Sequence, residues 1–155
     1  MRVGQLGILL VTHGPLAPEM LAAAERILGR ELPAFQALSL DWSEGWEEAR
    51  ARVEASLAAF PPEVDGFLVL TDLYGDTPSR AAAGLGMAGQ VEIVTGVNLP
   101  MVVRLGCADL AGRDVAEVAR WIEEKGRQSI RRATPAEAGP PSSPCADPPD
   151  RGERR

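Results

Sequence analysis

Residues 7–14, GILLVTHG, combine an uninterrupted apolar run with a polar end. A run such as Gly7–Thr12 is typical of a strand that is buried on both faces of a parallel sheet. His13 follows at the point where this strand ends, and it is the single histidine of the chain. The segment therefore predicts a buried strand whose carboxyl end carries the chain's only imidazole group.

Three further apolar runs alternate with amphipathic stretches along the chain. Buried strands joined by crossover helices predict an α/β fold, in which a doubly wound, mainly parallel sheet of order 2-1-3-4 carries helices on both faces. A short C-terminal edge strand is expected at Gln128–Arg132. The other predicted strands are Phe35–Leu40, Gly66–Thr71 and Val91–Thr95, and the predicted helices are Pro18–Leu28, Glu44–Phe60, Thr77 to about Met87, Leu99 to about Leu105 and Asp114–Lys125.

Two of these helices carry recognisable caps. Ser43 is expected to cap the second helix, and Asn98 the fourth. The inner face of the second helix is expected to consist of Trp46, Ala49, Val53 and Leu57, which recur at helical spacing.

The composition is that of one soluble globular domain, with 155 residues, of which 45% are hydrophobic and 25% charged. The formal net charge of -6 and the lack of a long Lys/Arg run disfavour nucleic acid or an anionic membrane as the main partner. No apolar run approaches the roughly 18 residues that a membrane-spanning helix needs. We therefore expect a cytoplasmic protein without direct membrane insertion.

The composition changes at the C-terminal end. Residues 133–155 contain six prolines and no Val, Ile, Leu, Met or aromatic residue, so they have nothing to bury in exchange for ordering. They are predicted to form a disordered Pro-rich tail after a folded domain of residues 1–132. Two cysteines cannot form a disulfide framework or a four-thiolate zinc site, and Cys107 and Cys145 are each expected to be a free reduced thiol.

The predicted topology also locates a site. In an open α/β sheet, ligands bind beyond the carboxyl ends of the strands where the strand order reverses, here between the first and third strands. His13 ends the first of these and Asp72 the third. A lone histidine is often a plain loop residue, and a strand-ending aspartate often closes an Asx-turn. The coincidence of both at the switch point instead favours a carboxylate that fixes the imidazole tautomer and leaves the far nitrogen as a nucleophile.

Glycine-rich turns follow the third and fourth strands. They would aim helix N-termini and free N–H groups at the same crevice, which suits an anion such as a phosphoryl group. We expect no metal and no cofactor, since a single imidazole makes a poor first-row metal site. The candidate catalytic residues are His13 and Asp72, and the candidate phosphoryl-binding residues are Thr12, Gly14, Gly75, Asp76, Thr77 and Asn98.

Three motifs in this order resemble a known family. They are Thr12-His13-Gly14, DLYGDTP at residues 72–78 and GVNLPM at residues 96–101, and the likeness covers roughly Val3 to Arg132. The sequence resembles the IIA components of the mannose class of the bacterial phosphotransferase system, the mannose, fructose and sorbose family.

The resemblance implies a phosphotransferase component that takes part in sugar transport. It implies that His13 becomes a phosphohistidine, with phosphorylated HPr as donor and a IIB component as acceptor. Asp72 would be its hydrogen-bonding partner, and Thr77 would lie near the phosphoryl group. A homodimer that exchanges the final short strand is also implied. The family usually has Gly-Gly before Ser/Thr-Pro, whereas Asp76 follows Gly75 here, so an added carboxylate would either weaken phosphoryl retention or face solvent.

Four other protein classes are alternatives to this family. A histidine phosphatase normally has Arg before its strand-end histidine and needs a second histidine, whereas Thr12 precedes His13 here and no second histidine exists. Small cobaltochelatases, which are metal-tetrapyrrole enzymes, generally need a further histidine as well. A regulatory module that senses phosphorylation without sugar transport remains an alternative, as does the phosphocarrier subunit of dihydroxyacetone kinase.

Overall fold

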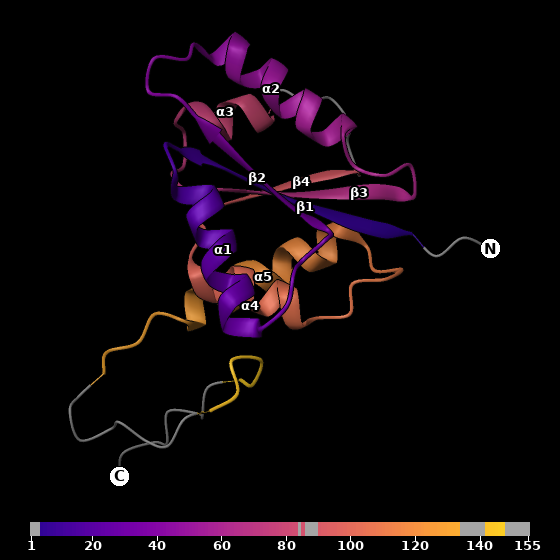
Figure 1. The fold of residues 1–155 in the computed structure, drawn as a ribbon, viewed down its shortest axis with the longest axis vertical. Coiled ribbons are helices and arrows are strands. Elements are labelled where there is room, and N and C mark those ends of the chain that lie inside the picture. The colour runs from indigo at the N-terminus through magenta and orange to yellow at the C-terminus, as the bar shows by residue number, and fades with distance from the viewer. Residues whose placement is uncertain (1–3, 84, 86–89, 134–141, 148–155) are drawn as a thin grey trace.

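The computed structural model describes residues 4–83, 85, 90–133 and 142–147, and strands and helices alternate along it (Figure 1). The predicted α/β fold is confirmed. The elements are β1 (Gln5–His13), α1 (Leu16–Leu28), β2 (Phe35–Leu40), α2 (Trp46–Ala58), β3 (Val64–Thr71), α3 (Thr77–Ala83), β4 (Val91–Thr95), α4 (Leu99–Cys107) and α5 (Val115–Gln128).

The four strands form one parallel sheet in the predicted order β2-β1-β3-β4. β1 lies between β2 and β3, so the loops that follow those two strands flank the carboxyl end of β1. His13 is opposite Leu40, the last residue of β2. The switch point between β1 and β3 therefore lies at His13, where the topology rule expects a site.

Helices cover both faces of the sheet. α1, α4 and α5 pack on one face and α2 and α3 on the other (Figure 1). Along β1, Ile8 and Leu10 contact the first group while Leu9 and Val11 contact the second, and all four side chains are fully buried. Each such side chain stabilises the fold by roughly 1.5–3 kcal/mol. This alternation explains why β1 is apolar without a break from Leu6 to Val11.

α2 differs from the prediction in its first turn. Its N-cap is Gly45, and Ser43 instead donates a hydrogen bond to Asp41 (3.1 Å). Trp46 was expected on the buried face, but its exposed fraction is 44%. The helix begins at Trp46, so this side chain lies at the end of the inner face rather than within it. The three other predicted positions, Ala49, Val53 and Leu57, are buried.

The predicted strand at 128–132 is not formed within this chain. Gln128 ends α5, and residues 129–133 form no strand in the part of the chain that the structure describes. The Ser129 N–H closes the helix by donating to the Lys125 carbonyl (3.0 Å). A strand needs the backbone of a neighbouring strand, so the segment is not expected to become one without such a neighbour.

The prediction of two free thiols is wrong, because Cys107 and Cys145 form a disulfide with a Cα–Cα distance of 5.6 Å. Cys107 is the last residue of α4, and Cys145 lies 38 residues later in the C-terminal tail. A tail without large apolar residues gives no sign in the sequence that it returns to a helix. The error therefore follows from the tail's composition.

Residues 142–147 belong to the tail that was expected to be disordered, and here the structure differs from that expectation. Arg104 and Lys125 both pair with the carboxylate of Asp147, which links this segment to α4 and α5. These contacts are polar, consistent with a segment that has almost nothing apolar to bury. The remaining tail residues, 134–141 and 148–155, lie outside the described residues.

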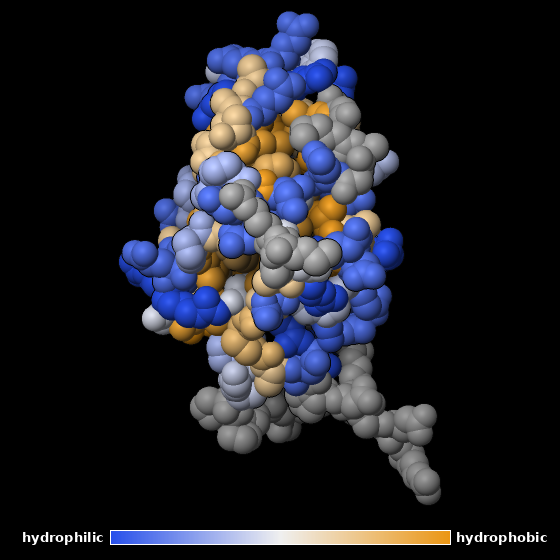
Figure 2. Space-filling model, turned by 90° about the vertical axis from the view of Figure 1, so that its right-hand side faces the viewer, coloured by the Kyte–Doolittle hydropathy of each residue, from blue (hydrophilic) through white to orange (hydrophobic). Residues whose placement is uncertain are grey.

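The molecular surface is mostly hydrophilic in the view of Figure 2, with hydrophobic side chains exposed between hydrophilic ones in the upper half. The described helices are all too short or too polar to span a bilayer. Several large hydrophobic side chains are nevertheless exposed, namely Leu16, Ile27, Trp42, Trp46, Leu73, Tyr74 and Ile130.

Candidate active site

His13 and Asp72 are in direct contact at the switch point of the sheet. The Asp72 Oδ2 atom lies 2.8 Å from the ring Nδ1 of His13 and accepts a hydrogen bond from the His13 backbone N–H at 2.9 Å. The other carboxylate oxygen accepts from the Leu73 N–H (2.9 Å). Because a carboxylate can only accept, Nδ1 must donate, which fixes the ring orientation. The exposed fraction of each of the two side chains is 16%, so both are accessible but largely enclosed.

A second carboxylate lies at the other ring nitrogen. Asp76 Oδ2 is 3.2 Å from His13 Nε2, and Asp76 Oδ1 accepts from the Thr77 N–H at 2.8 Å. The side chain of Asp76 is 48% exposed. It follows Gly75, whose φ of +78° is a left-handed conformation that favours glycine. The turn between β3 and α3 thus places Asp76 at Nε2, whereas Asp72 lies at Nδ1.

Trp42 is a site residue that the sequence analysis missed. Its ring stacks on the imidazole of His13, with centroids 5.2 Å apart and planes inclined by 16°. Trp42 comes two residues after the end of β2, the strand beside β1 in the predicted order. An aromatic residue in that position could have been found by asking which loop follows the neighbouring strand.

Two of the predicted phosphoryl-binding residues make hydrogen bonds that hold the fold. The Thr12 side chain is fully buried, and its hydroxyl oxygen accepts a hydrogen bond from the Ala17 N–H at 2.7 Å, in the first turn of α1. The Gly14 N–H donates to the Leu40 carbonyl (2.9 Å), and its φ of +52° turns the chain from β1 into α1. These groups hold β1, β2 and α1 together beneath the ring.

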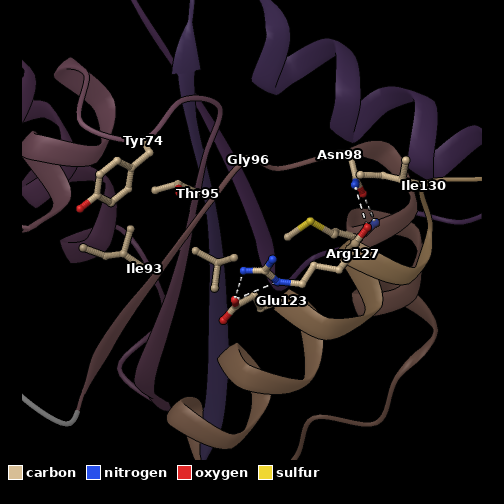
Figure 3. Close-up of a pocket in the computed structure, with 11 residues that line it drawn as sticks. Tyr74, Ile93, Thr95, Gly96, Asn98, Glu123, Arg127 and Ile130 are labelled. Atoms are coloured by element: carbon tan, nitrogen blue, oxygen red, sulfur yellow. Dashed lines mark hydrogen bonds and ion pairs between the residues drawn. The ribbon is translucent and has the colours of Figure 1, made fainter.

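Asn98 lines a separate cavity of ≈ 550 Å³ beside β4 (Figure 3). It caps α4 as predicted, accepting from the Met101 N–H at 3.0 Å, and its amide donates to the Ser129 hydroxyl at 3.2 Å. Its recorded hydrogen bonds tie α4 to the end of α5, and none of them reaches His13. Tyr74 lies on the other side of this cavity.

An ion pair borders the same cavity. Arg127 Nη2 lies 2.8 Å from Glu123 Oε1 on α5 (Figure 3). This hydrogen bond raises the pKa of the exposed Arg127 above its usual value, so the guanidinium stays charged. No group of three or more His, Cys, Asp or Glu side chains that could hold a metal ion occurs among the described residues.

Fold and site together define a class: a doubly wound α/β domain that presents one carboxylate-paired histidine at its switch point. The family model for the fructose IIA component of the phosphotransferase system matches residues 7–123, most of the chain. The chain therefore belongs to the mannose-class IIA family of the phosphotransferase system, and the resemblance found in the sequence is confirmed.

Individual relatives agree with this family. The mannose-specific EIIAB component of Escherichia coli K12 is 30% identical over 149 residues, which cover 92% of this chain and 45% of the relative. The chain thus spans about half the length of that curated protein. The mannose/sorbose-specific IIA subunit from Enterococcus faecalis has a similar structure, with TM-score 0.74, 27% identity, and coverage of 84% of this chain and 96% of that chain.

A third relative is the IIA protein associated with the fucose utilization operon of Streptococcus pneumoniae. It gives TM-score 0.70 and 27% identity, and the match covers 85% of this chain and 96% of that chain. Each of the two structural matches covers 96% of the other chain, so the likeness extends over nearly all of those chains.

Proposed function

We propose that this chain is a cytoplasmic phosphocarrier of phosphoenolpyruvate-dependent sugar phosphotransfer, which accepts a phosphoryl group on His13 and passes it on. The observation that carries the proposal is the 2.8 Å contact between His13 Nδ1 and Asp72 Oδ2. It makes Nδ1 the donor nitrogen and leaves Nε2 as the nitrogen that can react.

The proposed donor is phosphorylated HPr, which carries its phosphoryl group on a histidine. The lone pair of His13 Nε2 attacks phosphorus, a new N–P bond forms, and the N–P bond of the donor breaks with its electron pair returning to the donor imidazole. Positive charge develops on the His13 ring, and the Asp72 carboxylate stabilises it. The group then passes to a cysteine or histidine of a IIB component by the same kind of displacement.

Gly75 and Thr77 are the residues we propose for contact with the phosphoryl oxygens. They flank Asp76, which reaches Nε2, so the turn before α3 borders the space where the group would be bound. This geometry suits the backbone of Gly75 and the hydroxyl of Thr77 better than Thr12, Gly14 or Asn98, whose recorded hydrogen bonds serve the fold.

The alternatives receive less support. The relatives named above are mannose, sorbose or fucose-associated components of the phosphotransferase system, and none is a cobaltochelatase. The same names favour sugar phosphotransfer over a purely regulatory module or the subunit of dihydroxyacetone kinase. The direct test is to incubate the chain with phosphoenolpyruvate, Enzyme I and HPr and to map the modified residue by mass spectrometry.

Exposed apolar side chains on the His13 ring and directly after Asp72 in the chain support a protein as the phosphoryl donor. Trp42 is 78% exposed, and Leu73 and Tyr74, directly after Asp72, are 57% and 85% exposed. Exposed aromatic residues beside a reactive group are typical of surfaces that dock another protein. We propose that HPr and the IIB component both dock on this apolar rim, which consists of Trp42, Leu73 and Tyr74.

Tyr74→Ala is expected to weaken docking of phosphorylated HPr. Removal of a central aromatic contact typically costs more than 1 kcal/mol of binding, so KM should rise about tenfold while kcat changes little. Ile27→Ala is the matched control, because Ile27 is also exposed but lies at the far end of α1. Equal KM values for wild type and Tyr74→Ala, measured by initial phosphotransfer rates, would remove Tyr74 from the docking surface.

We also propose a homodimer in which Gln128–Arg132 of each subunit pairs with β4 of the other. β4 ends the sheet, so one side of its backbone is open to a further strand, and the cavity of ≈ 550 Å³ runs beside it. An exchanged strand would form backbone hydrogen bonds with this edge of β4. The need for a partner would also explain why residues 129–132 form no strand in a single chain.

Light scattering of the full chain is expected to give the mass of a dimer at tens of micromolar. Deletion from Ala133 onward should leave the dimer intact, because it removes only the tail, whereas deletion from Ile130 onward should give a monomer. A full chain that scatters as a monomer at this concentration contradicts the proposed exchange.

A further inference from the structure

Both nitrogens of the His13 ring face a carboxylate. Asp72 Oδ2 lies 2.8 Å from Nδ1, and Asp76 Oδ2 lies 3.2 Å from Nε2, the nitrogen proposed to react. We infer that Asp76 is a gate on the reacting nitrogen: its carboxylate lies in front of Nε2 and must turn away before this nitrogen can attack phosphorus. This inference rests on the proposed function, since it assigns a control to the same phosphoryl transfer.

The gate follows from the position and charge of Asp76. Its Oδ2 atom lies 3.2 Å from Nε2, so the carboxylate stands where the phosphorus atom must come to form the N–P bond. The incoming phosphoryl group is negatively charged, so the Asp76 carboxylate also repels it. The structure therefore shows a closed arrangement of the site.

Opening the gate requires one side chain to move. The Asp76 side chain turns away, and the Nε2 lone pair forms the N–P bond while the donor N–P bond breaks with its electron pair returning to the donor imidazole. Asp76 is suited to this movement because it is 48% exposed, whereas Asp72 is 16% exposed. Ion pairs between partly exposed groups are weak, so the closed state slows transfer without preventing it.

The same carboxylate acts again after transfer. A phosphoryl group on Nε2 occupies the space that Asp76 Oδ2 faces, and it brings two negative charges beside a third. Like charges at this distance repel, so Asp76 shortens the life of the phosphohistidine and favours release of the group. Asp76 is therefore a positioning residue that sets both the rate of loading and the time for which the group is held.

The test uses the full chain and three variants. Asp76→Asn removes the charge but keeps an oxygen that can accept from the Thr77 N–H, and Asp76→Gly removes the contact entirely. Asp109→Asn is the control, because Asp109 is an exposed carboxylate that likewise accepts a backbone N–H, from Ala111, in the loop after α4. Single-turnover transfer from phosphorylated HPr gives the loading rate, and decay of the isolated phosphoprotein gives the lifetime.

Both Asp76 variants should load about fivefold faster than wild type and hold the phosphoryl group about fivefold longer, the size of effect expected for a partly exposed charge pair. Asp109→Asn should match wild type in both measurements.

Loading rates and lifetimes that are the same in wild type and both Asp76 variants overturn the gate while leaving the proposed function intact. Slower loading in both variants also overturns it, since Asp76 would then assist attack. If neither wild type nor any variant accepts a phosphoryl group on His13 from an active relay, the proposed function itself is wrong, and the gate with it.

Discussion

His13→Ala is expected to abolish phosphoryl transfer to this chain. The substitution removes the chain's only imidazole, so no other side chain in the site can form a phosphoramidate. Wild type should gain one acid-labile phosphoryl group in the relay with phosphoenolpyruvate, Enzyme I and HPr, and His13→Ala should gain none. Intact-mass measurement before and after brief acid treatment checks both statements on the same sample.

The fold should survive this substitution. The His13 ring lies at the end of β1 rather than in the core, and the backbone N–H of residue 13 keeps its hydrogen bond to Asp72. Melting temperature and far-UV circular dichroism therefore serve as controls for loss of structure. A phosphoryl group mapped to Ser or Thr in wild type, or one that persists in His13→Ala, would show that His13 is not the acceptor.

The fold could be predicted from the sequence because its strands are buried on both faces. Gly7–Val11 and Gly66–Leu70 are apolar on both faces of the sheet, so each strand can be recognised from its own sequence. The segment 128–132 is different, because its proposed strand depends on an edge outside its own chain. The sequence of this short segment could suggest a strand, but it could not show which strand it would pair with.

The site could be predicted only where topology alone determines position. His13 and Asp72 end neighbouring strands, so the strand order brings them together, and the structure records that contact. Trp42 reaches the ring from a loop, and the conformation of a loop is not set by strand order. Asp76 was named as a candidate, but its contact with Nε2 depends on loop conformation in the same way. Cys145 approaches Cys107 through a tail with no apolar pattern, which left the disulfide without any signal in the sequence.

Asp72→Asn is expected to lower the rate of phosphoryl transfer by about 10²–10⁴, the range typical of a well-placed orienting group. Asp72 Oδ2 accepts from Nδ1 and from the His13 backbone N–H, while Oδ1 accepts from the Leu73 N–H. An asparagine has only one oxygen, so it cannot accept at both places. If its amide nitrogen faces the ring, it donates to Nδ1 and selects the tautomer in which Nε2 carries the proton and cannot attack.

The alternative placement puts the amide oxygen at the ring and the amide nitrogen against the Leu73 N–H. The productive tautomer then survives, but the negative charge that stabilises the imidazolium is lost. Each placement sets one amide nitrogen against a backbone N–H, which costs about 1–3 kcal/mol of folding stability. A lower melting temperature is thus expected together with slower transfer, and stability alone cannot distinguish a catalytic role from a structural one.

Asp114→Ala separates the two roles. Asp114 caps α5 by accepting from the N–H groups of Ala116 and Glu117, so it has a structural role like that of Asp72 at the start of this helix. We expect Asp114→Ala to lower the melting temperature, because it removes an N-cap, without slowing single-turnover transfer per folded molecule, and Asp72→Asn to lower both. Transfer at the wild-type rate in folded Asp72→Asn would mean that the carboxylate holds the loop after β3 and takes no part in activating His13.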